Sequence, residues 1–480
     1  MNKAKKSIWD SPLTSSLIHS QKVGKAEMLM GYLIGPFGAM LASGIFTSML
    51  QSYFTDVLKL DLAFLTILQL ASTVLIIAAN LVVGQLIERT RLLAGKARPW
   101  ILLSALTMSV GSVLMFIVPF ENPAARMVWV AVAYNLYYAV AYPIYSTANS
   151  TLVPVSTRDS RQRGALASFV NMSGLAVMGF GSMVFPMLVS YALKDDEHLW
   201  FVTMLAVAVF TALTVYLQYR FTRERVTEEL RTNQAQTRAG AKAPALGTQL
   251  RAVASEKWWW IIMLFFVLFQ WSGAIKNCSM AYFCKWNLNN ASPDAWGVAQ
   301  SFLAIAGAVP MAIAAVFVVP LTNRFTKRIV VFAGMVLGVL GGVIAGLAGS
   351  SILPVAVGIA LKCLGSAPAA YMILAMLSDV IDHIEQKRGL RTDGLTMSIY
   401  SSITVAATPI CNALFSALLG LCGYNANADL ALGLAAQTAV AQNTISVSYI
   451  WIETVAYGLC AVLILMFGVE KALSAHRKAQ

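Results

Sequence analysis

The chain has 480 residues, of which 58% are hydrophobic and only 12% carry a charge, and its mean hydropathy is +0.68. This composition excludes an ordinary soluble domain, in which about a quarter of the residues are charged. The net charge of +13 does not require a nucleic-acid partner, because the basic cytoplasmic face of a membrane protein lies against anionic lipid. We therefore expect the lipid bilayer, and no nucleic acid, as a partner.

Long apolar stretches recur along the whole chain. A membrane-spanning helix needs about 20 mostly apolar residues, and twelve segments meet this requirement. We predict an all-α membrane protein with spans near 28–53, 62–87, 100–120, 127–152, 165–192, 199–219, 259–283, 294–321, 329–349, 352–378, 394–421 and 446–468.

The density of Lys and Arg alternates from one loop to the next. With both termini in the cytoplasm, 29 of the 35 Lys and Arg residues lie in cytoplasmic segments, and the external segments hold only Lys59, Arg126, Lys194 and Lys285. Cytoplasmic loops carry such an excess of positive charge. The pattern predicts two cytoplasmic termini in a multi-pass protein of the plasma membrane, which is the inner membrane in a Gram-negative cell.

The longest polar stretch, 223–257, separates six predicted spans from six. We interpret it as a cytoplasmic linker between an N-terminal six-helix bundle, 1–222, and a C-terminal six-helix bundle, 258–480. Two six-helix halves around a site near the middle of the membrane are typical of the major facilitator fold.

Small residues mark one face of the ninth predicted span. The glycines there recur every four residues, at Gly334, Gly338, Gly342 and Gly346. Small residues at this spacing let two helices approach closely in a membrane, so we expect a helix-packing face.

The six cysteines and four histidines show no pattern for metal or redox chemistry. The cysteines are scattered singly in or just past apolar spans, and no two histidines form an H-x-x-x-H pair, a spacing that is typical of zinc ligands. A pair of nucleophile and base is not evident either. We expect no metal, no cofactor and no enzymatic activity.

Two charged segments resemble one family of transporters. The first is GQLIERTRLLAGKARPW at 84–100, preceded by YFTDV at 53–57, and the second is SDVIDHIEQKRGLRTDG at 378–394. Both are similar to the glycoside–pentoside–hexuronide:cation symporters, the melibiose-permease group of the major facilitators. The resemblance implies a secondary transporter that moves a sugar by alternating access, with helices 1, 4, 7 and 10 lining its cavity.

The charged residues of these two segments are also candidates for a gate at the cytoplasmic side. We expect a cytoplasmic gating network of ion pairs that breaks and re-forms during transport. Its members are Arg98, Asp379, Asp382, Glu385, Lys387, Arg391 and Asp393. The alternative is a solvated charged loop.

The sequence departs from the family at the cation site. The resemblance implies Asp residues in helices 1, 2 and 4 that bind sugar and cation, but the matching positions hold Met40, Ile76 and Asn80, and helix 4 has no carboxylate. The Lys of helix 11 in that family falls near Val405. Sodium needs hard oxygen ligands, usually with a carboxylate, so we expect no sodium site; coupling to H⁺ or facilitated diffusion remains. Asn80 stays a candidate substrate ligand.

Three charged residues lie well inside the predicted spans: Lys276, Lys362 and Glu453. A charge inside the membrane is costly and is a candidate functional site. We expect Lys362, near the middle of helix 10, and Lys276 on helix 7 to bind substrate, although Lys276 could also extend to the outer surface. Glu453 either pairs with a lysine or carries a proton.

Polar and aromatic side chains add to this candidate site. On helix 4 the residues Tyr134, Tyr138, Tyr142 and Tyr145 share a face within about 80° in an α-helix. Aromatic rings suit the apolar faces of a sugar, but such a stripe also serves ordinary helix packing. The amides of Asn149, Gln270 and Asn277 complete the set of predicted substrate ligands.

Together these features predict a secondary transporter for a sugar-like solute. Two lysines without a carboxylate in the central helices favour an acidic glycoside or a hexuronide. The alternatives are a neutral glycoside or pentoside, a lysolipid or another amphiphile, and, from a different class, a membrane sensor that does not transport.

The positive charges generate a test of topology. Reporter domains fused after Gly240 and after Gln480 should both report a cytoplasmic location, because 29 of 35 basic residues lie on that side. A fusion after Lys194 serves as the external control. An external signal from either of the first two fusions contradicts the predicted orientation.

Overall fold

The computed structural model describes residues 15–90, 92, 94–120, 122–157, 159–233, 251, 253–388 and 393–469. Within these ranges the chain is helical, and its one extended pairing is an isolated bridge between Leu92 and Gly95. π-Helical and 3₁₀ turns, labelled η, interrupt several of the α-helices.

The described helices of the first half follow the predicted spans closely. In chain order they are η2 Glu27–Ile34, α1 Gly35–Ile45, η3 Phe46–Leu50, η4 Tyr53–Val57, α2 Leu62–Arg89, α3 Arg98–Leu114, α4 Pro123–Asn135, η5 Leu136–Ala141, α5 Tyr142–Ser156, α6 Ser160–Gly179, η6 Phe180–Val184, α7 Phe185–Leu188, η7 Val189–Leu193, α8 Glu197–Arg220 and α9 Arg225–Asn233.

The second half contains the longer helices. They are α11 Lys257–Trp286, η8 Pro293–Ala295, α12 Trp296–Arg324, α13 Lys327–Leu347, α14 Ile352–Arg388, α15 Asp393–Leu421, η9 Leu430–Ala436, α16 Ala439–Ser446, η10 Val447–Trp451 and α17 Ile452–Met466. The main departure from expectation is α14, which continues ten residues past the predicted end at 378.

Eleven helical segments in the described ranges are long and apolar enough to cross a membrane. The third predicted span corresponds to α3, which has only 17 residues and is therefore about 26 Å long. The chain is a multi-pass membrane protein, and a total of twelve spans stays a prediction.

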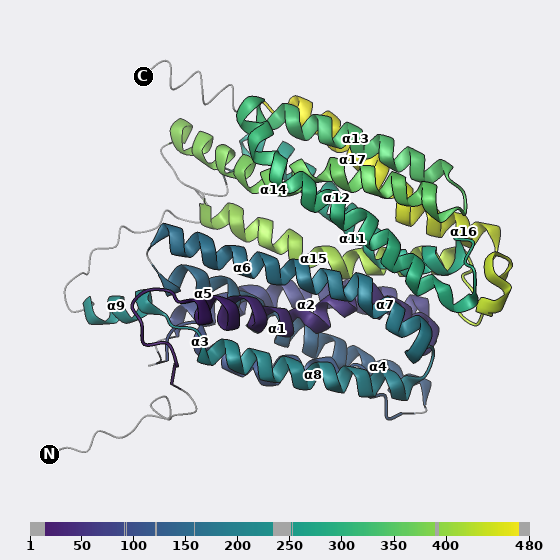
Figure 1. Cartoon of the computed structure of the whole chain (residues 1–480), viewed down its shortest axis with the longest axis horizontal. Helices are drawn as coiled ribbons and strands as arrows, with labels where there is room; N and C mark the ends of the chain where they lie inside the picture. The colour runs from purple at the N-terminus through teal and green to yellow at the C-terminus, as the bar shows by residue number, and fades with distance from the viewer. Residues whose placement is uncertain are drawn as a thin grey trace. The chain divides into compact units, whose positions relative to one another are not determined.

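Contacts divide the chain into two compact units. The first comprises the residues up to Leu50, Leu70–Phe185 and Leu193–Gly240, and the second comprises Gln51–Gln69, Pro186–Ala192 and Ala241–Gln480. In the first unit α8 packs along α1 and α3; in the second, α14 packs along α12 and α13, and α11 packs along α15 and α17 (Figure 1). The predicted boundaries at 222 and 258 stay a prediction, and residues 234–250 of the predicted linker lie outside the described ranges.

The glycines of α13 form the packing face that their spacing predicts. A Cβ atom on Gly341 would lie 2.5 Å from the backbone nitrogen of Lys362, and one on Gly338 would lie 2.7 Å from the Tyr457 ring. Gly342 lies in the same way against Thr454 and Gly346 against Trp451. The glycines therefore let α13 lie directly against α14 and α17, the two helices that carry Lys362 and Glu453.

This packing generates a stability prediction. Gly341→Ala should lower the thermal melting temperature of the purified protein, because its new methyl group meets backbone atoms that cannot move aside. Overpacking of this kind lowers the free energy of unfolding by about 1–3 kcal/mol. Gly174→Ala on α6 is the matched control, since nothing lies within 4 Å of its Cβ position. Equal melting temperatures for the two variants would contradict the close-packing argument.

Candidate functional site

A cluster of three charged side chains lies inside the second unit. The Nζ atom of Lys362 lies 2.8 Å from Oε2 of Glu453, and the Nζ atom of Lys276 lies 3.2 Å from Oε1. The hydroxyl of Tyr457 donates to the same Oε1 at 2.9 Å, and Lys362 donates to the carbonyl of Ile450 at 2.9 Å. We call Lys276, Lys362 and Glu453 the ion triad.

The members of the ion triad differ in exposure. Lys362 and Glu453 are each 1% exposed, whereas the side chain of Lys276 is 20% exposed. Two ammonium groups face one carboxylate, so the triad carries one net positive charge when all three groups are ionised. Since Lys362 has two close acceptors in the interior, Lys276 is the cation that can reach a ligand.

A π-helical turn immediately before Glu453 sets the surroundings of its carboxylate. The π-helical turn η10 ends at Trp451, two residues before it, and the Ile450 carbonyl at that turn accepts from Thr454 Oγ1 at 2.6 Å as well as from Lys362. π-Turns inside α-helices are frequent at functional sites. The turn thus places a backbone acceptor and a carboxylate side by side opposite α14.

Gln270 and Asn277 lie on the same side of α11 as Lys276. All three side chains are partly exposed, and at 100° per residue they fall within about 120° around the helix axis. On the same face, Phe269 stacks on Tyr457 with a centroid distance of 5.9 Å. The structure therefore brings three of the predicted substrate ligands together on one helix face.

The tyrosines of helix 4 differ in exposure. Tyr134 and Tyr145 are fully buried, and the Tyr145 hydroxyl donates to Gln218 at 3.0 Å, while Tyr138 and Tyr142 are partly exposed. The ring centroids of Tyr134 and Tyr138 lie 4.6 Å apart, so these two side chains share a face. The π-helical segment η5, Leu136–Ala141, interrupts the α-helix within the predicted stripe, and a single stripe of all four tyrosines stays a prediction.

Two predicted amide ligands are engaged within the first unit. Asn80 is partly buried and donates to the Ile76 carbonyl one turn earlier, at 2.8 Å. Asn149 accepts from Gln218 at 2.8 Å. Each amide has a second polar atom, so both residues stay candidate substrate ligands.

The predicted cytoplasmic network is divided into separate contacts. The Arg98 guanidinium donates to the carbonyls of Tyr219 and Ala94, all in the first unit. In the second unit Asp379 pairs with Lys327 at 2.6 Å and Lys387 pairs with Glu256 at 3.0 Å.

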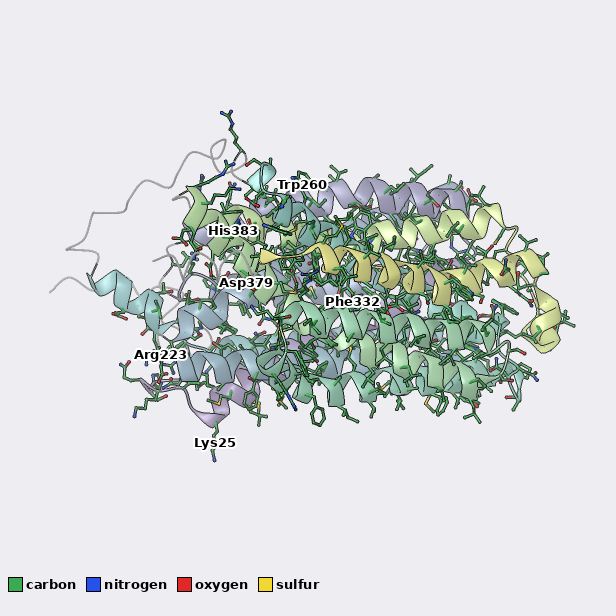
Figure 2. All side chains as sticks on the ribbon, turned by 90° about the horizontal axis from the view of Figure 1, so that it is seen from above. Lys25, Arg223, Trp260, Phe332, Asp379 and His383 are labelled. Carbon is green, nitrogen blue, oxygen red and sulfur yellow. The ribbon has the colours of Figure 1, made fainter. Side chains whose placement is uncertain are left out.

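The structure describes the remaining members of the predicted network unequally. Asp382 is exposed, Glu385 is partly buried, Arg391 lies outside the described residues, and the side chain of Asp393 is not described. The charged-loop alternative is wrong for residues 378–388, because α14 continues through them and distributes their side chains around the helix. Asp379 and His383 lie one turn apart there (Figure 2).

Sequence reasoning missed several carboxylates that the structure gives partners. Asp56, in the YFTDV segment, pairs with Lys285 at 2.5 Å and accepts from Tyr424 at 3.0 Å, all within the second unit. Burial, and then the charge of Asp56, hold the pKa of Tyr424 well above its usual range, so its phenol stays a donor. The motif marked Asp56, but its partners lie more than 200 residues away in sequence.

Two further carboxylates are buried at helix ends. Glu27 pairs with Arg225 at 2.7 Å, and Glu224 accepts from the backbone N–H groups of Lys96, Ala97 and Arg98 at 2.7–2.8 Å. A carboxylate at the start of a helix satisfies amides that the helix leaves free. Glu224 therefore fixes the first charged segment, 84–100, to the residues after α8.

Comparison with known proteins gives one consistent result. A family model described as "MFS/sugar transport protein" matches residues 31–471. The chain is 29% identical over 474 residues to the isoprimeverose transporter of Lactiplantibacillus pentosus, covering 96% of this chain and 92% of that protein. It is 22% identical over 409 residues to a glucuronide carrier protein homolog of Escherichia coli (strain K12), covering 83% and 84%.

Solved structures share the fold. The crystal structure of the nucleoside transporter NupG matches with a TM-score of 0.61 at 13% sequence identity, covering 92% of this chain and 98% of that one.

The ion triad generates a prediction of stability. Lys362→Met should lower the free energy of unfolding by on the order of 3 kcal/mol, because it removes the closest partner of a buried carboxylate. Lys276→Met should cost less, since Lys276 is partly exposed and its loss leaves a balanced pair of Lys362 and Glu453. Thermal melting of both purified variants tests this order, and the reverse order would contradict the assigned roles.

Proposed function

Because the chain belongs to the MFS/sugar transport protein family, we propose that it moves an acidic glycoside or hexuronide by alternating access. The resemblance to the glycoside–pentoside–hexuronide:cation symporters is confirmed, and the chain is a multi-pass sugar-type transporter of the plasma membrane, not an enzyme. The proposal includes twelve spans with both termini in the cytoplasm, with α3 as the twelfth span.

The net positive charge of the ion triad is the observation that supports an acidic solute. A sugar carboxylate would supply the second negative charge that two lysines and one glutamate need, and a charge away from water is stable only when it is paired. We assign the contact with this carboxylate to Lys276, the partly exposed member. Lys362, expected from the sequence to be the principal ligand, instead holds Glu453 in place through its 2.8 Å ion pair.

A neutral glycoside is the second candidate. It is favoured by the relative that is 29% identical over nearly the whole chain, an isoprimeverose transporter, since isoprimeverose is an uncharged sugar. The relative described as a glucuronide carrier protein homolog supports the acidic candidate.

Uptake of a matched pair of sugars separates the two candidates. In proteoliposomes, Lys276→Gln should weaken the apparent affinity for 4-nitrophenyl glucuronide about ten- to a hundredfold, since a charge-assisted hydrogen bond contributes roughly 1.5–3 kcal/mol. The affinity for 4-nitrophenyl glucoside should change little.

Lys59→Gln, which removes the same charge from an exposed loop position, is the control and should leave both affinities unchanged. An equal loss for both sugars with Lys276→Gln would favour the neutral glycoside.

We further propose that transport does not depend on sodium. The positions of the family's carboxylates hold Met40, Ile76 and Asn80, none of which carries a negative charge. Among the described residues no three His, Cys, Asp or Glu side chains lie close enough to hold a metal ion. Glu453 is the candidate group if H⁺ is the coupling ion.

Uptake measured at fixed pH in sodium buffer and in potassium buffer should therefore agree within about twofold, because a carboxylate is the usual hard ligand for such a cation. Imposing a pH gradient in either buffer then tests coupling to H⁺. Strong stimulation by sodium would require a cation site built from other residues.

A further inference from the structure

The face of α11 beside the ion triad carries polar groups with no hydrogen-bond partner among the described residues. Gln270, Gly273, Lys276 and Asn277 are all partly exposed there. Lys276 reaches Glu453 at 3.2 Å, but the amides of Gln270 and Asn277 make no side-chain hydrogen bond with any described residue. Polar side chains at membrane depth normally pair with protein or line a water-filled path, so this face is suited to a polar ligand.

Gly273 leaves an open space in the middle of this face. Outside its own helix, the one atom within 4 Å of its Cβ position is Glu453 Oε1, at 4.0 Å. The glycines of α13 differ, since there a Cβ atom would overlap a neighbouring helix. Glycine costs a helix about 0.5–1 kcal/mol relative to alanine, and at Gly273 helix packing gives no reason for this cost.

The surroundings of this space match the parts of a sugar acid. Gln270 lies about one turn before Gly273 and Asn277 about one turn after it, and both can bind hydroxyl groups. Lys276 offers an ammonium group to a carboxylate. The partly exposed ring of Phe269, which stacks on the buried Tyr457, lies at the neighbouring turn, where an apolar sugar face can pack.

We propose that Gly273 is a specificity-determining residue: its missing side chain forms a notch in which a pyranose ring lies against the backbone of α11. Glycine permits this close approach of backbone to ligand. Gln270 and Asn277 then bind ring hydroxyls on either side, and Lys276 binds the carboxylate. The inference rests on the proposed function of this site and adds the residue that limits the size of the ring and its substituents.

A graded series at one position tests the notch. In proteoliposomes, Gly273→Ala should raise the KM for 4-nitrophenyl glucuronide at least threefold, and Gly273→Leu should lower uptake at least tenfold. Both effects should extend to 4-nitrophenyl glucoside, because the added side chain meets the ring and not the carboxylate. The melting temperature should not fall for Gly273→Ala, whose methyl group finds open space.

Gly174→Leu is the matched control, because its Cβ position has nothing within 4 Å, and it should transport as the unmodified protein does. Normal uptake by Gly273→Leu overturns the notch. If Gly273→Leu fails to fold, Gly273→Ala decides, and an unchanged KM overturns the proposal. If the Gly273 variants take up both sugars poorly while Lys276→Gln affects both sugars equally, the notch stands and the acidic-solute proposal is wrong. If the Gly273 variants take up both sugars normally while Lys276→Gln weakens the affinity for the glucuronide alone, the notch is wrong and the acidic-solute proposal stands.

Discussion

A carboxylate held between two lysines inside an apolar helical unit is the interaction on which the site depends. Removing Glu453, Lys276 and Lys362 from water is costly, and the cost is offset only by short contacts among them. The structure supplies these contacts at 2.8 and 3.2 Å, with Tyr457 and the Ile450 carbonyl filling further hydrogen-bond positions. The excess of one positive charge is the basis on which we propose an acidic solute.

The packing of α13 is a precondition for this arrangement. Its glycines lie against the backbone of α14 near Lys362 and against Thr454 and Tyr457 of α17. Larger side chains on α13 would move both helices outward. The glycine of α11 has the opposite function in our proposal, because at the Cβ position of Gly273 the nearest atom of another helix is Glu453 Oε1, at 4.0 Å, and no close packing requires a glycine there. The same residue type therefore closes one side of the site and opens another.

The carboxylates outside the spans stabilise helix ends. Asp56 with Lys285, Glu256 with Lys387 and Glu27 with Arg225 are buried or partly buried pairs. Each pair lies at or beyond the end of a predicted span. A charged side chain costs less free energy there than in the middle of the membrane, because water is near. The ion triad differs from them because it lies within the spans and sets two lysines against one carboxylate.

The amino-acid sequence by itself determined the membrane class, the approximate limits of the helices and the family, because a spanning helix needs a long apolar segment and charged motifs occur at fixed spacing. It also marked Lys276, Lys362 and Glu453, since charges inside apolar spans are rare. Only the tertiary structure decided their pairing: Lys362 and Glu453 lie 91 positions apart, and no local pattern encodes a contact of that range.

Tertiary structure likewise decided the angular position of side chains, because π-helical segments such as η5 change the spacing on which a helical face is predicted. The continuation of α14 to Arg388 was also missed, since its last ten residues are too polar to count as part of an apolar span, although Val380, Ile381 and Ile384 among them are buried.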